Sequence, residues 1–137
     1  MRIDGRCHCG EVRYEAEVDP NAVLICHCTD CQALTGTAFR AVVAAPAAQF
    51  ALRSGTPKSY VKVAESGNKR RQAFCGNCGS PIYSCAAENP QSYSLRIGTI
   101  VQRAGLSPAR QIWRRSALKW VDRLASVPAH DAGFGGH

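Results

Sequence analysis

Between residues 11 and 18 the chain alternates strictly between apolar and polar positions. Every second residue from Val12 to Val18 is apolar, and the residues between them are charged. A repeat of two places the apolar side chains on one face of a strand and the charged side chains on the other. The pattern therefore predicts a half-buried strand over 11–18, which the turn residues 19–21 end.

Shorter apolar runs, separated by turn-forming residues, continue this pattern along the chain. The runs on either side of residues 65–68 are typical of a hairpin, and residues 34–37 are typical of a turn. Beyond Ser107 the apolar residues recur irregularly, which favours one or two helical turns that Pro128 closes. The further strands that we predict are 22–25, 39–45, 50–53, 60–63, 69–74, 81–86 and 94–100. Together these elements predict a mainly β domain of short, mostly antiparallel strands.

The length of 137 residues suits one domain, and a hydrophobic content of 45% is enough to bury a modest core. We expect this domain to span 1–128, followed by a flexible C-terminal tail over 129–137. No apolar run approaches the roughly 20 residues that cross a bilayer, and the first residues lack the apolar core of a secretory signal. We therefore expect a cytoplasmic protein with no membrane contact.

Seven of the eight cysteines fall into three closely spaced groups, which are the strongest chemical signal in the chain. The groups are Cys7 with Cys9, Cys26 with Cys28 and Cys31, and Cys75 with Cys78. In a secreted chain such cysteines would suggest a disulfide framework. The C-x-C and C-x-x-C spacings, in a chain without an export signal, favour metal ligation instead.

The two outer pairs are predicted to close one four-thiolate zinc site. Tetrahedral zinc holds its sulfurs about 3.8 Å apart, whereas alternate residues of an extended strand lie roughly 6.6 Å apart. The chain must therefore curl at the ligands, which glycine allows because it tolerates positive φ. The glycines that flank the two pairs are Gly5, Gly10, Gly76 and Gly79. A zinc ion held in this way would connect the two ends of the sheet. The alternative to a zinc site is that the four cysteines are simply buried and reduced.

The inner trio, Cys26, Cys28 and Cys31, has no obvious fourth ligand. His27 lies between two of the trio, so its side chain should project away from a shared ion, and Cys85 is interpreted as a small buried residue. Catalytic zinc sites commonly keep one position open for water or substrate. An open trio would bind a thiol, stabilise its thiolate at neutral pH and present it to the carbon of a small aldehyde.

Two other interpretations of the trio stay open. In the first, it is a second structural ion site, completed by a ligand that the sequence does not identify. In the second, Cys28 and Cys31 are a redox-active C-x-x-C pair. The redox interpretation is the weaker of the two, because no βαβ pattern surrounds these cysteines.

Four motifs follow one another in an order that resembles a known family, and the resemblance covers roughly residues 3 to 128. The motifs are Gly5-x-Cys7-x-Cys9-Gly10-x-Val12, Cys26-His27-Cys28-x-x-Cys31, Gly36-Thr37-Ala38-Phe39 and Phe74-Cys75-x-x-Cys78-Gly79-Ser80-Pro81. This pattern resembles the glutathione-dependent formaldehyde-activating enzyme family, which is shared with the centromere protein V group. Ile112 and Trp113, followed by Ser116 and Trp120, are similar to its C-terminal signature. Family members often carry His where this chain has Gln111.

The resemblance implies a β-tent fold similar to the Mss4-like group, built around zinc. It also implies two zinc ions per chain: a structural ion on Cys7, Cys9, Cys75 and Cys78, and a catalytic-type ion on Cys26, Cys28 and Cys31. The activity that it implies is S-(hydroxymethyl)glutathione synthesis, a carbon–sulfur lyase reaction written in reverse. The implied partners are a small thiol such as glutathione and formaldehyde or another small aldehyde.

The formal net charge of +7 keeps a second class of function in view. A basic surface attracts small acidic ligands or nucleic acid, so the protein would then be a zinc-stabilised binding module for nucleic acid or protein. The basic residues are scattered, however, and the chain has no dense basic tract and no recognisable groove-reading helix. We therefore rank this function second, and a thiol-redox or zinc-storage role third.

Overall fold

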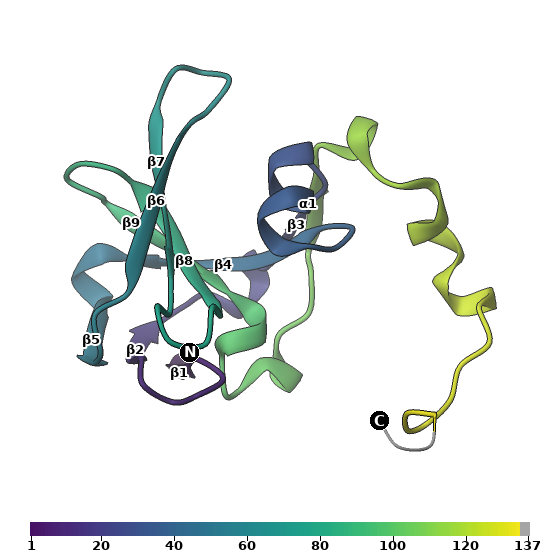
Figure 1. Cartoon of the computed structure of the whole chain (residues 1–137), viewed down its shortest axis with the longest axis horizontal. Helices are drawn as coiled ribbons and strands as arrows, with labels where there is room; N and C mark the ends of the chain where they lie inside the picture. Colours follow the sequence, from purple (N-terminus) through teal and green to yellow (C-terminus); the bar gives the residue numbers. More distant parts are fainter. Residues whose placement is uncertain (135–137) are drawn as a thin grey trace.

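The computed structural model describes residues 1–134, which fold into two β-sheets and several short helices (Figure 1). The smaller sheet has the strand order β1 (Arg2–Arg6), β2 (Arg13–Glu17) and β5 (Phe50–Ser54). The larger sheet has the order β10 (Arg110–Ile112), β3 (Leu24–Cys26), β4 (Arg40–Pro46), β9 (Ser92–Arg96), β8 (Pro81–Ala86), β7 (Lys69–Phe74) and β6 (Lys58–Val63). Neighbouring strands are antiparallel except β10, which runs parallel to β3.

One α-helix, α1 (Thr29–Thr35), follows β3 and lies beside the larger sheet (Figure 1). The other helical segments within residues 1–134 are short 3₁₀ helices. They span Pro20–Ala22, Ala47–Gln49, Ile97–Thr99, Arg103–Gly105, Arg114–Ser116 and Lys119–Ser126. The mainly β fold that the sequence predicts is therefore confirmed, and it is consistent with an Mss4-like arrangement.

The hydrophobic core contains side chains from both sheets. The alternation predicted from the sequence is confirmed, because Val12, Tyr14, Ala16 and Val18 are all buried. The hydroxyl of Tyr14 lies 2.8 Å from Thr99 Oγ1, so the one polar atom of this buried side chain has a partner. The charged residues between them face away from the core, as a strand with one buried face requires.

Several elements differ from the expectation. Strand β1 was not predicted, because Ile3 is its only large apolar residue. Helix α1 occupies part of the expected turn over 34–37 and begins inside the cysteine trio. The strand expected over 94–100 ends at Arg96 and continues as a 3₁₀ helix. Strand β10 lies at the start of the segment where helical turns were expected, because hydrogen bonds with the β3 segment hold this part of the chain extended. The expected helical turns follow it, as the 3₁₀ helices Arg114–Ser116 and Lys119–Ser126.

After β10 the chain leaves the sheets, and its last part (green to yellow) runs beside them in Figure 1. The expected flexible tail over 129–137 is described only as far as residue 134, and residues 135–137 lie outside the described part. The domain limits and the flexibility of the tail stay predictions. Within residues 1–134, no helix is both long and apolar enough to cross a membrane.

Candidate functional site

The two outer cysteine pairs meet in space. Cys7 and Cys9 follow β1, Cys75 and Cys78 follow β7, and their four sulfur atoms all lie within 4.8 Å of one another. The sulfur of Cys9 is 3.6 Å from that of Cys7 and 3.8 Å from that of Cys75. These distances match the roughly 3.8 Å between the sulfurs of tetrahedral zinc. The fold therefore brings the outer pairs together into one set, called here the four-cysteine cluster.

Two glycines form the tight turns that bring these sulfurs together. Gly10 has a φ of 82°, and its amide donates to the carbonyl of Cys7 at 3.1 Å. Gly79 has a φ of 80°, and its amide donates to the carbonyl of Cys75 at 2.8 Å. Glycine adopts such positive φ values without steric cost. Gly5 and Gly76 do not have positive φ, so only two of the four flanking glycines adopt the turn conformation that was expected of them.

Ser80 links the two turns of the four-cysteine cluster. Its hydroxyl oxygen accepts a hydrogen bond from the amide of His8 at 3.0 Å and lies 3.2 Å from the sulfur of Cys78. This hydroxyl, with nearby amides, lowers the pKa of Cys78 to about 5. The amide of Cys78 lowers the pKa of Cys75, but burial and neighbouring thiols outweigh it and raise that pKa to about 11. The thiol of Cys78 therefore ionises readily. Four thiolates so close together would repel one another, so they can all be ionised only with a cation between them.

The trio also converges, at the junction of β3 and α1. Cys26 ends β3, Cys28 is the N-cap of α1, and Cys31 lies in the first turn of the helix. The sulfur of Cys28 accepts a hydrogen bond from the amide of Cys31 at 3.2 Å, and the three sulfurs lie within 4.8 Å of one another. Cys26 and Cys31 are buried, whereas Cys28 is partly exposed. The start of one helix thus gathers all three thiols on one side.

The three thiols of the trio differ in how readily they ionise. Burial raises the pKa of Cys26, and it raises the pKa of Cys31 to about 12. Burial also acts on Cys28, but the amide of Cys31, the neighbouring thiols and the charge of Lys62 outweigh it and lower the pKa of Cys28. Cys28, the most exposed of the three, is therefore the first to become a thiolate.

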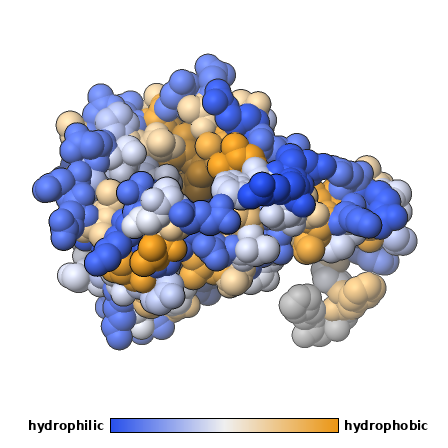
Figure 2. Space-filling view, turned by 90° about the horizontal axis from the view of Figure 1, so that it is seen from above, coloured by the Kyte–Doolittle hydropathy of each residue, from blue (hydrophilic) through white to orange (hydrophobic). Residues whose placement is uncertain are grey.

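A cavity of about 280 Å³ opens beside the trio, and Cys28 lines it. Its other lining residues are Thr29, Asp30, Lys62, Ala64, Glu65, Trp113, Arg115 and Ser116. An ion pair of 2.8 Å between Lys62 and Asp30 connects β6 to α1 across this cavity. From above, Figure 2 shows a hollow with an apolar floor and hydrophilic rims, in the part of the molecule between the β6–β7 hairpin and α1.

Trp113, in the wall of this cavity, has a strained backbone conformation. Its φ of 59° is in the left-handed region, which costs a residue other than glycine on the order of 1–3 kcal/mol and is often found at functional sites. The guanidinium of Arg115 lies 4.7 Å from the centroid of the Trp113 ring. The sequence pointed to Trp113 only through the family signature. It did not place Lys62 or Arg115 beside the trio, because no local pattern brings these distant segments together.

His27 belongs to neither cluster. Its ring is fully buried, its Nε2 donates to Oε1 of Gln111 at 2.7 Å, and it lies edge-on to Phe39 with 5.6 Å between ring centroids. Its Nδ1 is buried without a hydrogen-bond partner among residues 1–134. Gln111, the position where the family often has His, therefore supports His27 from β10. Cys85 lies in the hydrophobic core, outside both clusters.

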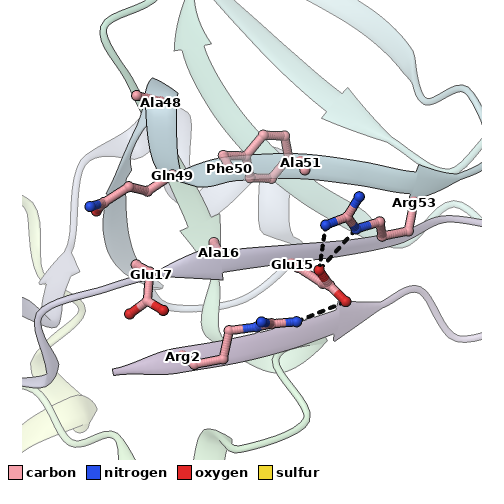
Figure 3. Close-up of a pocket in the computed structure, with 9 residues that line it drawn as sticks. All are labelled: Arg2, Glu15, Ala16, Glu17, Ala48, Gln49, Phe50, Ala51 and Arg53. Atoms are coloured by element: carbon pink, nitrogen blue, oxygen red, sulfur yellow. Dashed lines mark hydrogen bonds and ion pairs between the residues drawn. The ribbon is translucent and has the colours of Figure 1, made fainter.

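A second cavity, of about 220 Å³, lies on the smaller sheet (Figure 3). The side chains of Arg2 and Arg53 both reach the carboxylate of Glu15, at 2.8 Å and 2.7 Å. The charged side chains at the centre of this cavity are therefore paired with one another, and none of the residues that line the cavity is a cysteine or a histidine. This cavity has none of the chemistry found beside the trio.

The donor atoms of both clusters suit a soft metal ion. Sets made only of thiolates are typical of zinc, whereas magnesium and calcium prefer oxygen donors. Four sulfurs fill a tetrahedral shell, and three leave one position for a ligand from outside. Both clusters are therefore able to hold metal ions, and the trio, whose three sulfurs leave a position free, borders a cavity through which such a ligand could enter.

These features define a mainly β protein with one closed and one open cysteine cluster. The chain belongs to the family described as glutathione-dependent formaldehyde-activating enzyme, whose sequence profile matches residues 2–116. Among solved structures, it resembles the crystal structure of a Rhodobacter sphaeroides protein, a Northeast Structural Genomics target, with a TM-score of 0.59 at 19% identity. That match covers 79% of this chain and 98% of the other, and it supports the fold alone. A comparison with curated proteins found no match.

Proposed function

We propose that this protein is a zinc-dependent enzyme of the carbon–sulfur lyase type, which joins a thiol such as glutathione to formaldehyde or a related small aldehyde. Membership of the family supports a formaldehyde-activating, glutathione-related function. The observation that carries the proposal is the open trio, three sulfurs within 4.8 Å of one another beside a cavity lined by Cys28.

In this proposal the two clusters have different roles. Cys7, Cys9, Cys75 and Cys78 hold a structural zinc, because four sulfurs leave no position for a substrate. Cys26, Cys28 and Cys31 hold a catalytic-type zinc, which would keep an incoming thiol as its nucleophilic thiolate at neutral pH. A reducing compartment such as the cytoplasm would keep the seven cysteines of the two clusters free to bind metal.

The proposed reaction needs no oxidant and no further reactant. The thiol sulfur attacks the carbonyl carbon and forms one carbon–sulfur bond, while the electrons of the carbonyl π bond move to oxygen. The proton released by the thiol ends on that oxygen, which becomes a hydroxyl group. The reverse reaction breaks the same carbon–sulfur bond. The chain's own contribution is to hold the thiol in the cavity, with Trp113 as a wall and the Lys62–Asp30 pair bridging its two sides.

This function is tested by NMR exchange spectroscopy with ¹³C-formaldehyde and glutathione. The zinc-loaded protein should accelerate exchange between free and thiol-bound formaldehyde, and Cys28→Ser should abolish the acceleration. Cys85→Ala is the matched control, because this cysteine lies in the core and outside both clusters. If the wild-type protein leaves the exchange rate unchanged, the proposed reaction is wrong.

The alternative is a zinc-stabilised binding module without catalysis, which the net charge of +7 favours. Binding to nucleic acid through phosphate contacts weakens steeply as the salt concentration rises. A titration of duplex DNA at two salt concentrations therefore separates the alternatives: salt-sensitive binding without any effect on formaldehyde exchange would favour the module.

A further inference from the structure

The cavity beside the trio has three walls, which come from distant parts of the chain. The start of α1 supplies Cys28, the end of β6 and the turn after it supply Lys62 and Glu65, and the segment after β10 supplies Trp113 and Arg115. Its volume of about 280 Å³ is at the small end of the range for small-molecule sites, so it suits one small ligand. Any charge that the walls leave unpaired is therefore available to that ligand.

Four of the residues that line this cavity are acidic or basic, and only two of them pair with each other. Lys62 and Asp30 form the ion pair of 2.8 Å that crosses the cavity. Arg115 and Glu65 take part in none of the ion pairs among residues 1–134, either with each other or with another group. The cavity therefore presents one unpaired positive charge and one unpaired negative charge, on two different walls.

Arg115 is supported by a contact that does not neutralise its charge. Its guanidinium lies 4.7 Å from the centroid of the Trp113 ring. An arginine that stacks on an aromatic ring in this way keeps the N–H groups at its edge free to donate hydrogen bonds. Its neighbour Arg114 pairs instead with Asp122, at 2.8 Å, so that this carboxylate is already engaged. Arg115 is therefore able to bind a carboxylate from outside the chain through two parallel hydrogen bonds.

We propose, as a refinement that rests on the proposed function, that Arg115 and Glu65 bind the zwitterionic amino-acid head of a γ-glutamyl thiol such as glutathione. Arg115 binds the α-carboxylate of this head and Glu65 binds its α-ammonium group, while the sulfur of the thiol lies at the trio. Two opposite charges on one carbon atom complement two unpaired, opposite charges in one cavity. The γ-glutamyl arm separates the head from the sulfur by several bonds, which suits a head that binds on walls other than that of Cys28.

The test compares three thiols by calorimetric titration of the zinc-loaded protein at low salt. Glutathione has the complete head, and N-acetylglutathione lacks only the ammonium charge. N-acetylcysteinylglycine lacks the whole head but keeps the thiol and the glycine carboxylate. Each exposed charge contact contributes about threefold to fivefold in affinity. The wild-type protein should therefore bind glutathione about tenfold more tightly than N-acetylcysteinylglycine, with N-acetylglutathione between them.

Two variants remove one charge each. Glu65→Gln should weaken glutathione binding about threefold to fivefold and leave N-acetylglutathione binding within about twofold, because that probe has no ammonium group to lose. Arg115→Gln should weaken the binding of both these thiols about threefold to fivefold and leave N-acetylcysteinylglycine binding within about twofold. Glu88→Gln and Arg53→Gln are the matched controls, since both residues are exposed and neither lines this cavity; they should change no affinity. Native mass spectrometry establishes that each variant keeps its metal ions before the titration.

The outcomes separate this inference from the proposed function. If the wild-type protein binds the three thiols equally, the contacts with the head are wrong while the thiol site stands. The same conclusion follows if Arg115→Gln weakens N-acetylcysteinylglycine as much as glutathione, or if Glu65→Gln weakens N-acetylglutathione as much as glutathione. If the wild-type protein binds none of the three, the thiol site is wrong as well. Loss of the preference for glutathione in both variants, and in neither control, supports the inference.

Discussion

His27 is buried beside the trio, and Gln111 is the hydrogen-bond partner of its ring among residues 1–134. The other ring nitrogen is already without a partner in that part of the chain. A buried polar atom that loses its partner costs about 1–3 kcal/mol. The contact therefore gives Gln111 a structural role, separate from any contact with a substrate.

Replacing Gln111 by Ala should lower the free energy of unfolding by about 1–3 kcal/mol, because His27 then has two unpaired nitrogens. Urea denaturation of the zinc-loaded protein measures this loss. Gln91→Ala is the control, since Gln91 is exposed and donates only to the carbonyl of Asn89; it should change stability by less than about 0.5 kcal/mol. Equal effects of the two substitutions would contradict the role given to Gln111.

At the scale of elements, α1 shows how far local sequence patterns can be trusted. The spacing of Cys26, Cys28 and Cys31 was enough to predict a cluster, because sulfurs so close in sequence can meet after one turn of chain. The helix itself was missed: it has seven residues, and its only buried residue is Cys31. An apolar period of 3.6 cannot appear in so short an element. The cysteines were recognised as ligands, whereas the helix that positions them was not.

Cys28 serves this element twice, as a sulfur of the trio and as the N-cap that accepts from the Cys31 amide. Serine is a good N-cap and alanine a poor one. Cys28→Ser and Cys28→Ala should both lose the second metal ion, but the serine variant should be the more stable by about 1 kcal/mol. Native mass spectrometry counts the ions, and urea denaturation compares the two variants. Identical stabilities would mean that this side chain does not cap the helix.

At the scale of the whole molecule, the sequence predicted the two cysteine clusters but not the cavity. Cysteine pairs at short spacings are readable locally, and glycine beside them marks the turns. The cavity wall is assembled from Lys62, Trp113 and Arg115, which reach the trio only after β6 and β10 have taken their places in the sheet. Arg40 and Arg96 likewise carry charges typical of surface residues, and only the packing of the folded chain shows that they are buried.

The four-cysteine cluster joins β1 and β7, which belong to different sheets. Structural zinc contributes on the order of 10 kcal/mol in small domains, comparable to the whole stability of a protein of this size. Stripping the metal with a strong chelator should therefore abolish the cooperative thermal transition. Cys9→Ser should also lose the cooperative transition, because it removes one of the four sulfurs of this cluster.

Cys31→Ser is the matched control, since it removes a sulfur from the trio and leaves the four-cysteine cluster complete. This variant should keep one metal ion, counted by native mass spectrometry, and a cooperative transition in calorimetry. If the metal-free protein unfolds as cooperatively as the loaded protein, the four-cysteine cluster does not hold the fold together. If Cys31→Ser unfolds on isolation while Cys9→Ser does not, the roles of the two clusters are reversed.

The parallel pairing of β10 with β3 sets the order in which this site is completed during synthesis. Gln111 lies 84 residues after its partner His27, so the ribosome exposes the trio long before β10 exists to flank it. For that interval the nascent thiols stand open to oxidants and to any thiol-seeking ion in the cell. The thiols of the trio are therefore synthesised well before the strand that flanks them.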